Sequence, residues 1–419
     1  MAARRPGICT AALLLGLALD APAQGPPSEA EVRLPPLIHE ALRQNPEVAA
    51  ARARVEAARA RIPQARTLPD PTVSLGTQVS SDLSRRLENE LAVAQTLPFP
   101  GKLGLQALVA RYEADQTAEE LRAKEREVAA RVKVAFYELF RAHRFIGIKQ
   151  GESETLKTFA RIAQTRYEVD RASQQDVLKA QVELSRALTE LVILEQERET
   201  AQSALNAVLY RSPRDPIGTP VPRELEPFMF RFDELEQRAL SQRPEIAAAQ
   251  RSFDRAQAAV ELANRQYFPD FTVGAAYTGV NGASDKVKFF VSINIPLLYT
   301  KPRYDARVEE AAAQRAAARA TQEAVRIETL AGVKDRFERV RAFERLVTLY
   351  RTSLLPQASQ ALEAAIAGYQ TGKVDFLTLL DNQRALAQTE RAHVTAWTEF
   401  EQRQAELERV VGADLGSLK

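Results

Sequence analysis

The sequence is poor in the residues that build metal centres and disulfide frameworks. Its 419 residues include one cysteine and three histidines. These are too few for a zinc or iron–sulfur site within one chain, or for a set of disulfides. It also has no His-Glu-x-x-His, Gly-x-Ser-x-Gly or glycine-rich phosphate-loop motif, so no pattern indicates catalysis. We therefore expect a protein that is not an enzyme and that has no metal site and no cofactor.

A strong excess of either charge is also missing. The 57 Lys and Arg residues nearly cancel the 55 Asp and Glu residues, which leaves a net charge of +2. This balance argues against a nucleic-acid-binding protein, because such proteins carry a strongly basic surface. The hydrophobic content of 45% is enough for an extensive core, so a disordered or fibrous chain is not expected.

Long hydrophobic runs are absent, and the one apolar stretch near the N-terminus is short. Residues 8–19 follow two arginines and span about 12 residues, whereas a membrane-spanning helix needs roughly 18. The small residues Ala21-Pro22-Ala23 come next and suit a signal peptidase. We predict that residues 1–23 are a cleaved signal peptide rather than an anchor. The mature chain would then lack Cys9, the only cysteine, and would have no transmembrane helix.

The chain repeats one sequence pattern twice. Three segments of the first half recur in the same order in the second half: residues 41–51 with 239–249, 68–73 with 268–273, and 167–181 with 369–383. The offsets of 198, 200 and 202 residues are nearly constant, so the two halves are internal structural repeats. A linker with five prolines between residues 213 and 227 separates them. We therefore place the first repeat with its linker at 24–231 and the second at 232–419.

Each repeat predicts a helix, two strands, a very long helix and a final helix. The helices are expected at 46–67, about 102–166 and 174–209, and at 244–267, about 303–370 and 374–412. In each repeat the two shorter helices together nearly match the long helix in length. Two short helices stacked end to end could therefore run beside one long helix.

The four predicted strands alternate between apolar and polar residues. Four strands are too few to close a barrel, because about eight is the smallest number that does. Half of a β-sandwich or a sheet covered by helices would explain the alternation. In another interpretation, several chains each contribute four strands to one transmembrane barrel, since about ten residues suffice for a tilted strand to cross a bilayer. The residues expected to face lipid are Val73, Leu91, Val273 and Ile293.

Aromatic residues gather where the strands meet the helices. They are Phe99, Tyr267, Phe268 and Tyr299. In a transmembrane barrel they would form an interfacial aromatic belt. Simple core packing at a strand-to-helix junction is the alternative.

Several motifs together resemble a known family. They are Ala-Leu-x-Gln-x-Pro-Glu in both repeats, Leu-Pro-Asp-Pro and Phe-Pro-Asp-Phe before the strands, and Phe99-Pro100-Gly101-Lys102 after the second strand. With the signal peptide and the repeated plan, the chain resembles the TolC family of outer-membrane efflux channels. The Pro-Gly-Lys motif is most similar to the branch that serves heavy-metal and other cation exporters of the RND type.

The resemblance implies a mainly α-helical homotrimer with a transmembrane β-barrel. Each chain would contribute four strands to a 12-stranded barrel that continues into a 12-helix periplasmic α-barrel. It implies insertion into the lipid of a Gram-negative outer membrane, docking to a periplasmic adaptor (membrane fusion protein) and linkage to an inner-membrane RND-type pump. The expected function is a passive duct of a tripartite efflux system that exports metal cations or small toxic compounds. The alternative, a periplasmic coiled-coil scaffold or adhesin, leaves four bilayer-length strands unexplained.

The resemblance also implies a closable periplasmic entrance at the turns that follow the long helices. The candidate gate and selectivity residues are Tyr369, Gly372, Lys373, Asp375, Asp381, Tyr167 and Asp176. The family pattern has an arginine where this chain has Val374, and Lys373 and Asp375 could substitute for it. Rings of carboxylates would favour cations, and a Tyr369 hydroxyl hydrogen bond would hold the entrance closed. For each residue, a solvated position at a helix turn is the alternative.

Overall fold

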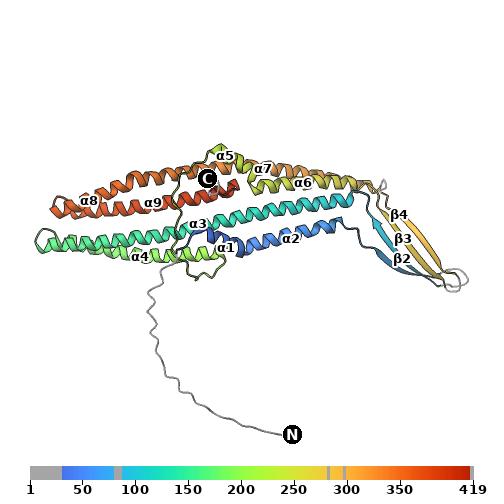
Figure 1. The fold of residues 1–419 in the computed structure, drawn as a ribbon, viewed down its shortest axis with the longest axis horizontal. Coiled ribbons are helices and arrows are strands. Elements are labelled where there is room, and N and C mark those ends of the chain that lie inside the picture. The colour runs from blue at the N-terminus through green and yellow to red at the C-terminus, as the bar shows by residue number, and fades with distance from the viewer. Residues whose placement is uncertain (1–30, 80–86, 281–283, 296–298, 416–419) are drawn as a thin grey trace, which may run out of the picture.

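The fold is an elongated bundle of helices with a four-stranded sheet at one end. The computed structural model describes residues 31–79, 87–280, 284–295 and 299–415. The predicted signal peptide and the loop at 80–86 lie outside these residues. Figure 1 shows the sheet at one end, the turns after α3 and α8 at the other, and the C-terminus between them. None of the helices in the described residues is both long and apolar enough to cross a membrane.

The two repeats have the same order of elements. The first contains α1 (Leu34–Gln44), α2 (Pro46–Arg66), β1 (Thr72–Val79), β2 (Leu87–Leu97), α3 (Lys102–Glu168) and α4 (Gln174–Leu209). The second contains α5 (Phe232–Gln242), α6 (Pro244–Arg265), β3 (Phe271–Val280), β4 (Lys286–Ile293), α7 (Lys301–Leu349), the π-helix η1 (Tyr350–Leu354), α8 (Leu355–Thr371) and α9 (Phe376–Val411). As expected, α2 and α4 run beside α3, and α6 and α9 run beside the rod formed by α7, η1 and α8 (Figure 1).

Two short helices, α1 and α5, were not predicted. They arise because the Ala-Leu-x-Gln-x-Pro-Glu motif is a break between two helices rather than the start of one. Asn45 has an extended backbone, and its side chain accepts a hydrogen bond of 2.8 Å from the backbone N–H of Glu47. Asn45 therefore ends α1 and caps α2, whose first residue is Pro46.

The second long helix is also less regular than predicted. A π-helical turn, η1, interrupts it at Tyr350–Leu354, and Pro356 follows in the first turn of α8. Proline has no backbone N–H, so the hydrogen bond to the carbonyl four residues earlier is lost at Pro356. Widening of the preceding turn is the local response to that loss.

The buried side chains form three clusters along the bundle. One lies in the first repeat and includes Phe136 and Leu205, and another lies in the second repeat and includes Val340 and Phe400. The Trp397 ring packs against both, with its centroid 5.0 Å from that of Phe140. The third cluster, near the α3–α4 and α8–α9 turns, takes side chains from both repeats. Apolar packing therefore joins the repeats at mid-length and at the turns.

The sheet is antiparallel, in the order β1-β2-β3-β4. Its register pairs Leu75 with Leu91, Val93 with Ala275, and Val273 with Val291. Directly opposed residues lie on the same face, so these apolar side chains share one face. Among the described elements, no helix covers this face, which disagrees with the helix-covered alternative. Leu75 is 83% exposed and Phe289 is 82% exposed.

Candidate functional site

The junction between sheet and helices is held together by a lysine. Lys102 is the first residue of α3, and its side chain is only 8% exposed. Its Nζ donates hydrogen bonds of 2.8 Å to Asp270 Oδ1 and to the Phe268 carbonyl. The same carboxylate oxygen accepts a hydrogen bond of 2.8 Å from the Phe99 backbone N–H. The motif at 99–102 in one repeat and the Phe-Pro-Asp-Phe motif of the other therefore form one site.

Three of the four predicted junction aromatics make contacts there. The rings of Phe99 and Phe268 stack with their centroids 4.6 Å apart, and the Arg265 guanidinium lies 5.5 Å from the centroid of Phe268. The hydroxyl of Tyr267 donates a hydrogen bond to Asp305. Tyr299, in contrast, is 80% exposed. Packing at the junction thus accounts for Phe99 and Phe268, whereas Tyr299 has no such explanation.

The residues predicted to face lipid all point to solvent in the single chain. Val73, Leu91, Val273 and Ile293 occupy the apolar face of the sheet, and each is more than one-third exposed. The opposite face carries polar side chains, and the hydroxyls of Thr96 and Thr272 lie 3.2 Å apart across β2 and β3. The sheet therefore has one apolar and one polar face, neither of which is covered by helices.

At the far end of the bundle, Tyr369 forms a cluster with residues of the other repeat. Tyr369 is 3% exposed, and its ring centroid lies 5.4 Å from that of Phe376. The Arg166 guanidinium lies 4.6 Å from the centroid of the Tyr369 ring, within range of a cation–π interaction. Burial raises the pKa of Tyr369, the charge of Asp176 raises it further, and Arg166 opposes both. The cluster brings together Tyr369 and Asp176 of the predicted residues and adds Arg166.

The Tyr369 hydroxyl does not make the expected hydrogen bond. Within the described residues it has no partner of normal geometry, although it is buried. The prediction that a hydrogen bond of this hydroxyl closes the entrance stays a prediction. In the single chain the Tyr369 ring packs against Arg166 and Phe376.

In the single chain Lys373 and Asp375 make other contacts, and their substitution for the missing arginine stays a prediction. The backbone N–H of Lys373 bonds to the Gly368 carbonyl at 2.8 Å, and the Asp375 side chain caps α9 by accepting from the Thr378 N–H at 3.0 Å. Hydrogen bonding with Thr378 lowers the pKa of Asp375. The cation beside Tyr369 comes from Arg166 on α3. Comparing the turn around Val374 with the family pattern does not reveal Arg166, because Arg166 lies in the other repeat, one residue before Tyr167.

The remaining predicted gate residues lie around this cluster. Gly372 ends α8 with a φ of 76°, in the left-handed region that favours glycine. Tyr167 is 41% exposed and is not part of the cluster. Asp381 lies on α9 with a side chain that is 61% exposed, and it pairs with Arg384 at 3.3 Å. Arg384 also pairs with Glu183 of α4 at 2.7 Å, so Asp381 belongs to a charged contact between the repeats.

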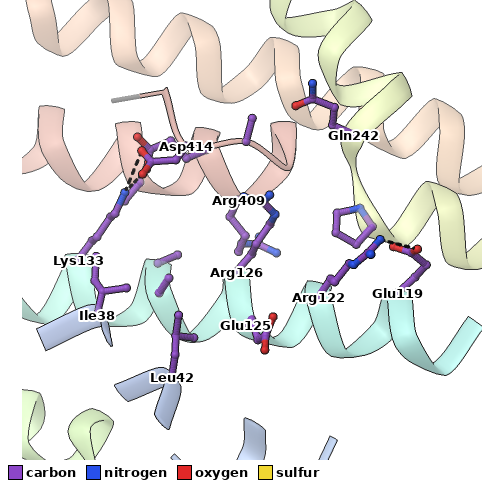
Figure 2. A pocket seen from close by; sticks show the side chains of 16 residues that line it. Ile38, Leu42, Glu119, Arg122, Glu125, Arg126, Lys133, Gln242, Arg409 and Asp414 are labelled. Atoms are coloured by element: carbon purple, nitrogen blue, oxygen red, sulfur yellow. Dashed lines mark hydrogen bonds and ion pairs between the residues drawn. The ribbon is translucent and has the colours of Figure 1, made fainter. Parts of the chain in front are cut away.

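A pocket of about 480 Å³ lies between the repeats at mid-length (Figure 2). Arg122, Arg126 and Lys133 of α3 face Arg409 of α9 across it, and it also contains four carboxylates: Glu119, Glu125, Glu408 and Asp414. Lys133 forms ion pairs with Glu408 and Asp414. The equal numbers of cations and anions give the pocket no preference for one sign. Among the described residues, no group of three or more His, Cys, Asp or Glu side chains could hold a metal ion.

Comparison with known proteins identifies similar chains. Residues 37–209 and 235–413 match the family model described as outer membrane efflux protein. The cobalt-zinc-cadmium resistance protein CzcC of Cupriavidus metallidurans is 23% identical over 374 residues, which cover 89% of this chain and 88% of that protein.

Solved structures have the same fold. The outer-membrane channel OprN matches with a TM-score of 0.76 at 23% identity, over 91% of this chain and 90% of its own. CusC matches with a TM-score of 0.77 at 18% identity, over 91% and 92%. The outer membrane protein VceC of Vibrio cholerae matches with a TM-score of 0.75 at 20% identity, over 91% and 96%. Because the family model covers most of both repeats, the chain belongs to the outer membrane efflux protein family.

Proposed function

We propose that this protein works as a homotrimer that forms the outer-membrane channel of a tripartite efflux system. The observation that carries the proposal is the sheet: four antiparallel strands with an exposed apolar face, a polar face, and unpaired outer edges on β1 and β4. Four strands cannot close a barrel, but three copies supply twelve. The apolar face, including Val73, Leu91, Val273 and Ile293, then contacts lipid, and Tyr299 lies in the interfacial belt.

The helices extend the channel away from the membrane. The 67 residues of α3 span about 100 Å at 1.5 Å per residue. Each chain contributes four helical rods side by side, so three copies form a 12-helix periplasmic barrel. The sequence 1–23 directs export and is removed, and the repeats 24–231 and 232–419 each form half of the protomer.

The turns at the far end form the periplasmic entrance. Tyr369, Arg166 and Asp176 join the α3–α4 turn to the α8–α9 turn within one chain, and Gly372, Lys373, Asp375 and Tyr167 shape the rim. This end docks onto a periplasmic adaptor, which links the channel to an inner-membrane RND-type pump. Similarity to a cobalt-zinc-cadmium resistance protein favours metal cations as cargo, and Asp381 repeated around the threefold axis would favour their passage.

Membrane fractionation and bilayer recording test this proposal. The mature protein should be found in the outer-membrane fraction, run as a trimer in detergent gels without boiling, and conduct ions in planar bilayers. A soluble periplasmic monomer would contradict the proposal and favour the scaffold alternative. A trimer in the outer membrane that never conducts would favour an adhesin.

A further inference from the structure

The two outer edges of the sheet are free, and the internal repeat provides a template for their pairing. Within the chain, β2 of the first repeat pairs with β3 of the second. Between two copies, β4 of the second repeat would meet β1 of the first repeat of the next copy. The β2–β3 boundary therefore shows how one repeat follows another around a ring.

The register of that boundary transfers directly. The motifs before the strands make Asp70 equivalent to Asp270, so Leu75 is equivalent to Ala275. The β1–β2 and β3–β4 pairings then make Val93 equivalent to Val291, because each lies opposite the third residue after its aspartate. Since Val93 pairs with Ala275 within the chain, the corresponding pair between copies is Val291 with Leu75.

We propose that β4 of one copy pairs with β1 of a second copy in this register, and that Lys301 of the first copy binds Asp70 of the second. This inference rests on the proposed trimeric channel. The register brings Leu75, which is 83% exposed, opposite Val291, which is 67% exposed, on the apolar face. A shift of the register by one residue would turn the apolar side chains of one strand to the polar face of the sheet.

The ion pair follows from the same template. Lys102 is the first residue of α3, which follows β2, and Lys301 is the first residue of α7, which follows β4. Lys102 binds Asp270, which also accepts the Phe99 N–H. Its counterpart Asp70 is exposed and makes no hydrogen bond or ion pair in the part of the chain that the structure describes. Asp70 is therefore free to bind the equivalent lysine, Lys301, of another copy.

Lys301 is able to take this partner. Its side chain is 59% exposed and pairs with Asp305 at 2.8 Å. An ammonium group has three donors, and Lys102 already serves two acceptors, Asp270 and the Phe268 carbonyl. Lys301 can thus keep Asp305 and bind Asp70 of the next copy. The Lys102 side chain is only 8% exposed, and we expect assembly to bury the Lys301 side chain to a similar extent at the boundary between copies.

Disulfide cross-linking tests the register. The only cysteine, Cys9, lies in the predicted signal peptide, so the mature chain needs no cysteine removal. Directly opposed Cβ atoms lie about 4.5–5.5 Å apart and diagonal ones about 7–8 Å apart, so oxidation distinguishes the two. We expect Leu75→Cys with Val291→Cys to give covalent dimers and trimers on boiled, non-reducing gels. Leu75→Cys with Phe289→Cys or Ile293→Cys, shifted by two residues, should give at most about one-tenth as much.

The internal boundary supplies the matched control. Val93→Cys with Ala275→Cys should form a disulfide within one chain and give no covalent oligomer, because these residues pair inside the protomer. Stronger cross-linking of either shifted pair than of the Leu75–Val291 pair would overturn the register. A protein that forms no trimer at all would instead contradict the proposed function, so the two failures are distinguishable.

Charge exchange tests the ion pair. Asp70→Lys or Lys301→Asp alone should lower the fraction of heat-resistant trimer by about tenfold, because each leaves like charges at a seam that assembly buries. The double variant Asp70→Lys with Lys301→Asp should restore most of it. If the double variant assembles no better than the single variants, while the Leu75–Val291 cross-link still forms, Lys301 does not bind Asp70.

Discussion

A half-buried carboxyl group between the repeats, that of Glu401, is expected to make the stability of this protein depend on pH. Glu401 on α9 lies against Tyr137 of α3 and lines a pocket of about 910 Å³. Burial raises the pKa of Glu401 from its ordinary value of 4.5 to about 7. A hydrogen bond with Tyr137 opposes this rise, and the negative charge of Glu408 adds to it.

The sign and the size of the effect follow from this shift. Between the two pKa values the native chain binds the proton more tightly than the unfolded chain, so stability falls as pH rises toward 7. The shift from 4.5 to about 7 corresponds to about 3 kcal/mol of unfolding free energy. We therefore expect Glu401→Gln, which keeps a polar side chain beside Tyr137 but cannot ionise, to remove up to about 3 kcal/mol of pH dependence.

Denaturant unfolding followed by far-ultraviolet circular dichroism would measure this. The native protein and Glu401→Gln should have similar stability at about pH 5 and differ at about pH 8, with the variant more stable. Glu363→Gln, which changes an exposed carboxyl on α8, is the control and should keep the native pH profile. Equal pH profiles for the native protein and Glu401→Gln would refute the assignment of this pH dependence to Glu401.

Three further predictions concern the sheet, the ion selectivity and the α8–α9 turn. Val73→Arg should destabilise the membrane-inserted trimer by about 2–4 kcal/mol, whereas Ser74→Arg on the polar face should assemble normally; equal loss of trimer in gels would contradict the assigned faces. Asp381→Asn should lower cation selectivity and weaken block by divalent cations in planar bilayers, and an unchanged channel would make Asp381 a solvated surface charge. Gly368→Ala should lower thermal stability by about 1–3 kcal/mol, because its Cβ would lie 2.6 Å from Val374 Cγ2; adding Val374→Ala should restore stability, and no recovery would contradict the clash.

The repeated elements could be predicted from sequence because their patterns are local. A period of two placed Val73 and Val273 on the apolar face, and the helical period that continues to about residue 166 predicted the length of α3. The break at Asn45 was missed because a proline in a first helical turn looks the same whether or not another helix precedes it. The π-turn before Pro356 was missed for a related reason, since the sequence does not indicate how a helix accommodates the lost hydrogen bond.

Contacts between the repeats could not be predicted in the same way. The motif with Lys102 and the motif with Asp270 were both recognised, but their ion pair depends on β2 and β3 being neighbours. Arg166 was missed because its partner, Tyr369, lies about 200 residues away in the other repeat. Which turn lies beside which is decided by tertiary packing, here by the apolar cluster that both repeats share.

The charged residues at the sheet junction occur in both repeats, whereas those beside Tyr369 at the far end occur in only one. At the sheet, both repeats keep the aspartate and the lysine of the junction. At the far end, the offset of 202 residues makes Gly368 equivalent to Arg166 and Thr378 equivalent to Asp176, so only the first repeat carries the charges. In a ring of three copies, the contact around Tyr369 would therefore form within each chain, and its counterpart around Tyr167 between chains would lack both charges.

This asymmetry predicts which contact holds the proposed entrance closed. The boundary within each chain has the contact of Tyr369 with Arg166 at 4.6 Å, so this contact should be the stronger restraint on the entrance. We expect Arg166→Ala to raise the resting conductance of the channel in planar bilayers, because it removes a contact that holds the two turns together. Tyr167→Ala should leave the conductance unchanged, because the contact around Tyr167 lacks both charges. A larger effect of Tyr167→Ala than of Arg166→Ala would mean that the boundary between copies holds the entrance closed.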